Sequence, residues 1–155
     1  MGRRRRFRGQ EWAVLAVLLG LTLLGGLAGE RRSPGVACPV AGPVTVVLDP
    51  GHGGIDPGAL NEAYGLVERD LALAVAERTA AILRAQGHTV ALTRTDNETA
   101  LGNSERGELA NACGAQRFVS IHFNSFTEPE VNHTKTFWGV RDKDEAFSRV
   151  MNATL

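Results

Sequence analysis

From residue 44 onward, short hydrophobic runs alternate with longer amphipathic stretches. Runs of β-branched and aliphatic residues predict buried strands over residues 44–48, 89–93 and 117–122. Apolar residues at helical spacing predict helices over residues 68–84 and 103–112. The first two predicted strands are therefore each followed by a predicted helix.

Residue types at the segment ends refine this pattern. Glycine adopts a left-handed conformation at little cost, so we expect Gly87 to end the first helix, and we expect Asn103 or Ser104 to cap the start of the second. A Gly-rich loop is predicted between the first strand and residue 65. Near the C-terminus, Lys-Thr-Phe-Trp-Gly over residues 135–139 predicts a fourth strand, and residues 144–154 predict another helix.

Alternating strands and helices predict an α/β fold with a largely parallel central sheet and helices on both faces. A chain of 155 residues is long enough for one globular core of ordinary size. Ligands in such folds gather at the carboxyl ends of the strands. His52 follows the first predicted strand and His122 closes the third, so we expect both at that edge.

The N-terminal part differs in composition from the rest. Five arginines within the first eight residues precede an apolar run over residues 12–24, which is typical of a signal peptide or an uncleaved membrane anchor. We expect residues 1–29 to direct export, residues 30–43 to form a linker, and residues 44–155 to form the folded domain. Positive charge before the apolar run places the remainder of the chain outside the cytoplasm, either secreted or anchored in the periplasm or cell envelope.

Charge and cysteine content narrow the possible partners. From Gly29 onward the chain has 12 Lys and Arg against 16 Asp and Glu, a net charge of −4. This balance gives no reason to expect nucleic-acid binding, which needs a basic face. Cys38 and Cys113 are the two cysteines. A disulfide between them, lipidation of Cys38, and a simple buried position for Cys113 near a helix end all remain open.

Two histidines and one glutamate are the strongest candidates for chemistry. His52 lies in Asp-Pro-Gly-His-Gly-Gly, where glycines let the backbone approach a ligand. That turn lacks the lysine and glycine spacing of a phosphate-binding loop, although a lone histidine there also fits a plain turn residue. Glu68 opens a helix, where the helix dipole alone already favours acids. His122 ends an apolar strand, so a buried core histidine is its alternative.

Taken together, these residue types fit a catalytic zinc site. Two imidazoles and one carboxylate from His52, Glu68 and His122 leave a fourth zinc position open, as in zinc hydrolases. Asn124 follows His122 by two residues and is a candidate to orient a ligand or to bind substrate, or else to cap the loop.

Five separated motifs in this order resemble the zinc-dependent N-acetylmuramoyl-L-alanine amidases of the amidase 3 type. The motifs are Val-Val-Leu-Asp-Pro-Gly-His-Gly-Gly at 46–54, Gly65 with Glu68, Leu-Thr-Arg at 92–94, Arg106 with Ala110-Asn111, and Phe-Val-Ser-Ile-His-Phe-Asn at 118–124. The resemblance implies one Zn²⁺ held by His52, Glu68 and His122. It also implies hydrolysis of the amide between N-acetylmuramic acid and L-alanine in peptidoglycan. Arg94, Arg106 and Asn111 would support the fold.

The chain departs from the family pattern near its C-terminus. The resemblance implies a second glutamate, the general base, on a strand that we expect to lie beyond Leu155, together with the family's last strand and helix. Glu128, Glu130 and Glu145 do not lie in a matching context. We therefore expect zinc binding with weak or absent hydrolysis from this chain. The alternative to an amidase is an inactive zinc- and peptidoglycan-binding fragment or regulator.

Overall fold

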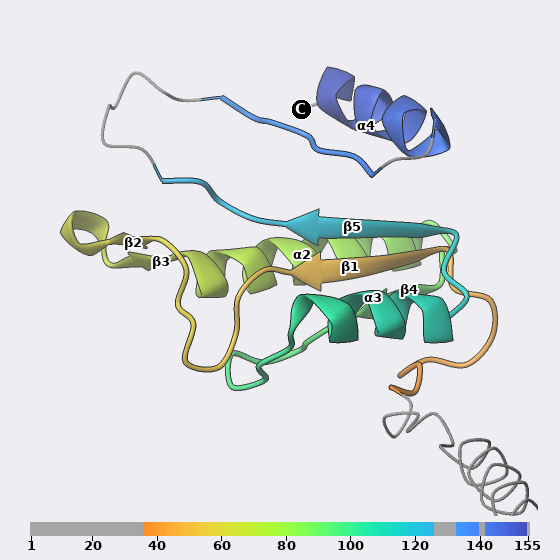
Figure 1. Cartoon of the computed structure of the whole chain (residues 1–155), viewed down its shortest axis with the longest axis horizontal. Helices are drawn as coiled ribbons and strands as arrows, with labels where there is room; N and C mark the ends of the chain where they lie inside the picture. Colours follow the sequence, from red (N-terminus) through yellow and green to blue (C-terminus); the bar gives the residue numbers. More distant parts are fainter. Residues whose placement is uncertain (1–35, 126–132, 140–141, 155) are drawn as a thin grey trace, which may run out of the picture.

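A parallel three-stranded sheet forms the centre of the domain (Figure 1). The structure is a computed structural model that describes residues 36–125, 133–139 and 142–154. The strands β1 (Val46–Pro50), β4 (Val90–Leu92) and β5 (Arg117–Ile121) lie in the order β4-β1-β5, all parallel. The three strands predicted from the hydrophobic runs are therefore present, each displaced or shortened by one or two residues.

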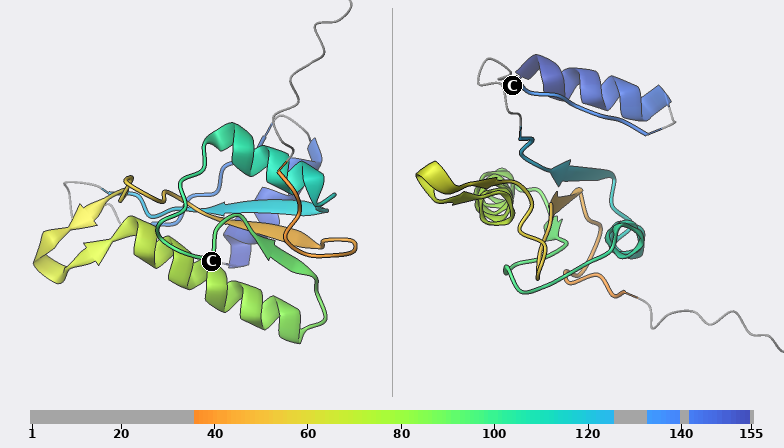
Figure 2. Two further views of the ribbon diagram at one scale, coloured as in Figure 1. Left: turned by 90° about the horizontal axis from the view of Figure 1, so that it is seen from below. Right: turned by 60° about the vertical axis from the view of Figure 1, so that its left-hand side comes forward.

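Helices cover the two faces of this sheet (Figure 2). Side chains alternate between the faces of a strand, so neighbouring residues of β1 enter different clusters. Val46 and Leu48 pack with Ala76 of α2 (Glu68–Ala85), whereas Val47 packs with Leu109 of α3 (Asn103–Ala112). The predicted α/β fold with helices on both faces is confirmed.

The two helix ends expected from sequence have different outcomes. Gly87 follows α2 with a φ of 87°, and its amide donates to the Arg84 carbonyl, as expected for a terminating glycine. The cap predicted for α3 is wrong, because Gly102 is the N-cap residue. The Glu105 carboxylate accepts a hydrogen bond from the Gly102 amide at 2.7 Å, so a side chain in the first turn of α3 caps the start of the helix.

A small hairpin occupies part of the region predicted as a loop. Strands β2 (Leu60–Asn61) and β3 (Leu66–Val67) pair antiparallel around a 3-10 turn, η1 (Glu62–Tyr64). Two-residue strands are too short to give an alternating sequence pattern. The hairpin projects beyond the carboxyl ends of β1 and β5 (Figure 1).

The predicted fourth strand is wrong. Residues 133–139 have no regular structure, and β5 keeps one neighbour in the sheet. This segment instead contacts α4 (Asp142–Thr154), where the Thr136 hydroxyl donates to the Ser148 carbonyl at 3.3 Å. Phe137 is 82% exposed. Local strand propensity is insufficient here because a strand also needs a neighbouring strand to pair with, and within the described residues the sheet ends at β5.

A disulfide joins Cys38 to Cys113, which settles the question that the sequence left open. Val36, Cys38 and Val40 also pack against the core cluster that contains Leu109. These residues fall in the segment expected to be a linker. The boundary at residue 44 stays a prediction.

The N-terminal apolar run lies outside the described residues, so its role as signal peptide or anchor stays a prediction. Within the described part of the chain, no helix is long and apolar enough to cross a membrane.

Candidate metal site

Three side chains from different elements converge at the carboxyl edge of the sheet. His52 follows β1, Glu68 opens α2, and His122 follows β5. His52 Nε2 lies 2.9 Å from Glu68 Oε1, and His122 Nδ1 lies 3.1 Å from both of those atoms. The structure therefore brings together all three residues that the sequence nominated as metal ligands.

The donor set fits a small divalent cation. In a tetrahedral zinc site with bonds of about 2.0–2.2 Å, the ligand atoms lie about 3.3 Å from one another. The three atoms here form a nearly equilateral triangle only slightly smaller than that. A single proton can join only two of the three atoms by a hydrogen bond. The lone pairs of the other pairs of atoms then still face each other. A divalent cation satisfies all three at once, so the chemistry of this set fits a metal ion.

Two arginines hold the turn that carries His52. Among the described residues, His52 is the one non-glycine residue with a positive φ, which is 62°. Contacts with the surrounding residues must hold the backbone in this conformation. Arg94 donates to the Pro50 and Gly51 carbonyls, and Arg106 donates to the Pro50 and His52 carbonyls at 2.9 and 2.7 Å. Both arginines are buried. Their hydrogen bonds hold the backbone of the turn that carries the His52 imidazole.

Asp49 ties this turn to the sheet. Its side chain is buried and accepts bonds from Arg106 Nη1 at 2.7 Å, Thr93 Oγ1 at 2.6 Å and Ser120 Oγ at 2.6 Å. These donors come from α3, the end of β4 and β5. Sequence reasoning placed Arg94 and Arg106 in supporting segments but missed Asp49, although a lone acid at the end of a buried apolar strand was an available signal.

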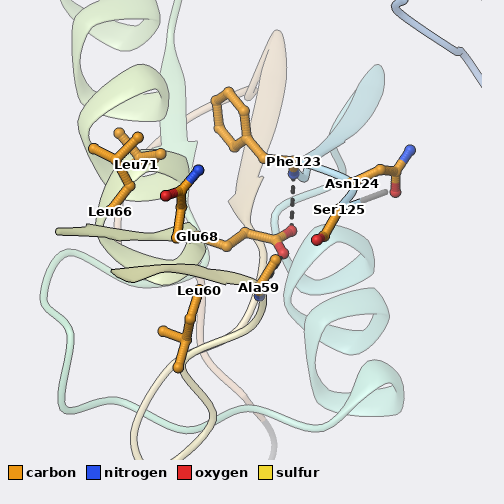
Figure 3. Close-up of a pocket in the computed structure, with 9 residues that line it drawn as sticks. Ala59, Leu60, Leu66, Glu68, Leu71, Phe123, Asn124 and Ser125 are labelled. Atoms are coloured by element: carbon orange, nitrogen blue, oxygen red, sulfur yellow. Dashed lines mark hydrogen bonds between the residues drawn. The ribbon is translucent and has the colours of Figure 1, made fainter. Parts of the chain in front are cut away.

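Glu68 is held by backbone donors from both sides. Oε2 accepts the Ala59 amide at 2.9 Å, and Oε1 accepts the Phe123 amide at 2.8 Å (Figure 3). Burial raises the pKa of the Glu68 carboxyl, but these bonds and those from the two histidines outweigh burial and hold the pKa below its ordinary value. Glu68 is thus an ionised carboxylate of fixed orientation.

The far side of the His52 ring contacts a second acid. His52 Nδ1 lies 2.9 Å from Asp56 Oδ2. Burial lowers the pKa of His52, but its hydrogen bonds and charge interactions with Asp56 and Glu68 outweigh burial, and the pKa lies above its ordinary value. Sequence reasoning missed Asp56 because its four-residue spacing from His52 means contact only if the Gly-rich turn folds back.

The alternative of a buried core histidine does not hold for His122. Its side chain is 49% exposed, and the ring lies over Gly51, where a Cβ atom would overlap the imidazole. The ring of His122 stands nearly perpendicular to that of His52, with an interplanar angle of 79°. Glycine at position 51 is therefore required to admit this ring.

A pocket of about 260 Å³ opens beside Glu68 (Figure 3). Its wall combines apolar and polar side chains, and Asn124 is among them: Ala59, Leu60, Asn61, Leu66, Glu68, Leu71, Phe123, Asn124 and Ser125. Asn124 is exposed and makes no hydrogen bond to the three converging residues, so its role stays a prediction. Arg69, the residue after Glu68, donates to the Gly54 carbonyl at 2.8 Å.

Comparisons with known proteins agree with this arrangement. Residues 46–154 match the family described as N-acetylmuramoyl-L-alanine amidase. The amidase AmiA of Salmonella typhimurium is 44% identical over 92 residues, which cover 59% of this chain and 31% of AmiA. The chain thus spans less than a third of the length of that relative.

Solved structures give the same result. The amidase AmiC2 of Nostoc punctiforme superposes with a TM-score of 0.66 at 38% identity, over 74% of this chain and 62% of AmiC2. The catalytic domain of CwlV, an amidase of Bacillus (Paenibacillus) polymyxa, superposes with a TM-score of 0.65 at 36% identity, over 71% of this chain and 61% of that domain. The family match covers most of this chain and includes the three converging residues, and the chain therefore belongs to the N-acetylmuramoyl-L-alanine amidase family of the amidase 3 type.

Proposed function

We propose that His52, Glu68 and His122 hold one zinc ion and that the domain hydrolyses the amide between N-acetylmuramic acid and L-alanine in peptidoglycan. The observation that carries this proposal is the convergence of His52 Nε2, Glu68 Oε1 and His122 Nδ1 within about 3 Å of one another in a member of an amidase family.

Zinc held by three protein ligands acts as a Lewis acid on a carbonyl oxygen and activates water. The chain's own residues prepare the site for this chemistry. Backbone amides of Ala59 and Phe123 keep the Glu68 carboxylate in one orientation. The adjoining pocket offers apolar side chains such as Leu66 and polar ones such as Asn124, which suits a substrate that carries both methyl groups and amides.

A second candidate is a zinc- and peptidoglycan-binding module without turnover. Within residues 36–125, 133–139 and 142–154, Asp56 is the one further carboxylate in contact with the three converging residues. Asp56 is bonded to the far nitrogen of His52 and is not directed toward the donor triangle. Because general acid–base assistance contributes about 10²–10⁴-fold in rate, a site without a base is expected to turn over slowly.

We further propose that the protein acts outside the cytoplasm, with peptidoglycan as its partner and with the membrane as a second partner if the N-terminal segment is uncleaved. The arginine-rich start and apolar run support export. The Cys38–Cys113 disulfide supports the same compartment, because such bonds persist mainly in oxidising surroundings.

The test combines zinc content with release of amide-cleavage products from peptidoglycan. It uses the full chain beside His52→Ala and His122→Ala. His88→Ala serves as a matched control, because His88 is an exposed histidine outside the donor triangle. We expect one zinc per chain in the wild type and in the control, and its loss in both site variants.

The products distinguish the two candidates. Release of stem peptides by the wild type, abolished in both site variants, supports the amidase. Stoichiometric zinc without release favours the binding module. A wild-type chain that retains no zinc overturns the metal site.

A further inference from the structure

Asp56 uses both of its carboxylate oxygens at the rim of the metal site. Oδ1 accepts the Gly58 amide at 3.1 Å, and Oδ2 lies 2.9 Å from His52 Nδ1. The backbone between these residues is also closed, because the Gly53 amide donates to the Asp56 carbonyl and the Asp56 amide donates to the Gly53 carbonyl, each at 3.1 Å. The carboxylate is therefore fixed relative to the ring that it contacts.

This contact selects one form of the His52 ring. An ionised carboxylate accepts hydrogen bonds and donates none, so the bond to Asp56 requires a proton on Nδ1. Glu68 faces Nε2 in the same way, so the two acids compete for the single proton of a neutral ring while no metal is bound. In a neutral imidazole the proton on Nδ1 leaves Nε2 with a lone pair. Nε2 is the atom that lies 2.9 Å from Glu68 and 3.1 Å from His122.

We propose that Asp56 is a positioning residue that selects the Nδ1–H tautomer of His52 and so directs the Nε2 lone pair into the zinc site. The inference rests on the proposed zinc site but concerns a residue outside the ligand set. Partners of this kind fix ring orientation and tautomer in other metal sites, and their loss weakens metal binding.

An asparagine at position 56 would favour the other tautomer of His52, with the proton on Nε2. An amide side chain has one oxygen and one NH₂ group, and the Gly58 amide requires an acceptor, so the oxygen turns toward Gly58. The NH₂ group then faces His52 Nδ1, which must accept. The ring proton moves to Nε2, where it occupies the position that the metal needs.

The experiment measures zinc affinity of the full chain by chelator competition in Asp56→Asn and Asp56→Ala. We expect the Kd for zinc to rise about tenfold in Asp56→Ala, because Asp56 is largely exposed and the effect belongs at the low end of the usual range of about 10–100-fold. We expect a larger rise in Asp56→Asn. A role limited to turn structure predicts the opposite order, because asparagine keeps the bond to Gly58 and alanine does not.

A second readout needs no metal. Glu68 is replaced by alanine in this experiment, because its carboxylate lies 2.9 Å from His52 Nε2 and competes with Asp56 for the ring proton when zinc is absent. Imidazole ¹⁵N shifts of the zinc-free protein at about pH 9, well above the ordinary histidine pKa, report the tautomer of neutral His52. In this Glu68→Ala background we expect Nδ1–H when residue 56 is aspartate and Nε2–H in Asp56→Asn. The same tautomer in both proteins, or tighter zinc binding by Asp56→Asn than by Asp56→Ala, overturns the inference.

Asp96→Asn is the matched control. Asp96 is an exposed aspartate whose Oδ1 accepts the amide two residues ahead, that of Glu98, as Asp56 does with Gly58, but it contacts no histidine. This variant should leave both the zinc Kd and the His52 tautomer unchanged. Failure of the wild type to bind zinc contradicts the proposed function, while the tautomer measurement still decides the role of Asp56.

Discussion

At the scale of single residues, two glycines make room for the imidazole rings. A Cβ atom at Gly51 would overlap His122, and one at Gly58 would lie 2.6 Å from His52 Cδ2. These glycines therefore admit side chains of the site, in addition to their part in the turn. From the sequence we expected these glycines to let the backbone approach a ligand, and that expectation did not include the packing of the two rings against them.

Gly51→Ala is expected to displace His122 from the donor triangle. Overpacking of this kind costs about 1–3 kcal/mol of stability, and metal sites tolerate displacements of only about 0.5 Å. We expect a clear loss of zinc affinity, measured by chelator competition, together with reduced stability in urea.

Gly107→Ala is its matched control. Gly107 lies inside α3, and a Cβ atom there would meet no atom within 4 Å. Alanine in a helix interior is about 0.5–1 kcal/mol more favourable than glycine, so this variant should gain stability and keep its zinc affinity. Equal zinc binding by both glycine variants would contradict the steric role assigned to Gly51.

At the residue scale the sequence identified the ligand candidates but not their supports. His52, Glu68 and His122 are recognisable because each residue type binds zinc and each lies at an element boundary. Asp56 and Asp49 are common acids whose roles depend on contacts, one across a folded turn and the other across 44 to 71 residues of chain. Contacts of this kind leave no recognisable pattern in the local sequence.

At the scale of elements, the Asp49–Arg106 pair joins the end of β1 to α3. Both side chains are buried, with exposed fractions of 3% and 9%. Removing one member leaves the other charge buried and unpaired, which costs more than the pair itself contributes.

Asp49→Ala should therefore lower the free energy of unfolding by about 3–5 kcal/mol, measured by urea denaturation. Glu145→Ala supplies the comparison, because it breaks the exposed pair with Arg149 within α4. Exposed pairs contribute about 0–1 kcal/mol, so this variant should remain close to the wild type. Similar losses in the two variants would argue against the buried network.

Elements with long or strongly apolar patterns were predictable, and those that depend on a partner were not. The helix that begins at Glu68 and the apolar strand β1 follow directly from the spacing of their hydrophobic residues. Residues 135–139 have equally good strand propensity, but a strand requires a neighbour for its amides, and here the segment contacts α4 instead. The β2–β3 hairpin shows the converse, since pairing creates strands where the sequence has no strand pattern.

At the scale of the whole molecule, the disulfide fixes the N-terminal segment to the far end of α3. Cys38 and Cys113 are separated by 75 positions, so the bond closes a long loop. By the chain-entropy relation, a loop of this length lowers the entropy of the unfolded state by an amount worth about 4.5 kcal/mol. Sequence reasoning left this bond open because the distance between two cysteines so far apart depends on the completed fold.

Cys38→Ser combined with Cys113→Ser is expected to lower the free energy of unfolding by about 2–4 kcal/mol, measured by urea denaturation. The wild type treated with reductant should match the double variant, and the double variant should be insensitive to reductant. A wild type whose stability does not change on reduction would show that packing of Val36 and Val40 against the core already holds this segment.

The same disulfide also determines the path of a mechanical force through the domain. A pulling force that enters from the N-terminal side at Cys38 passes through the sulfur bridge to Cys113 and leaves toward β5. The chain between the two cysteines, which includes His52 and Glu68, lies outside that covalent path. Tension on the N-terminal side would therefore bypass the turn that carries His52 and the start of α2, and it would reach the donor triangle through the segment that carries His122.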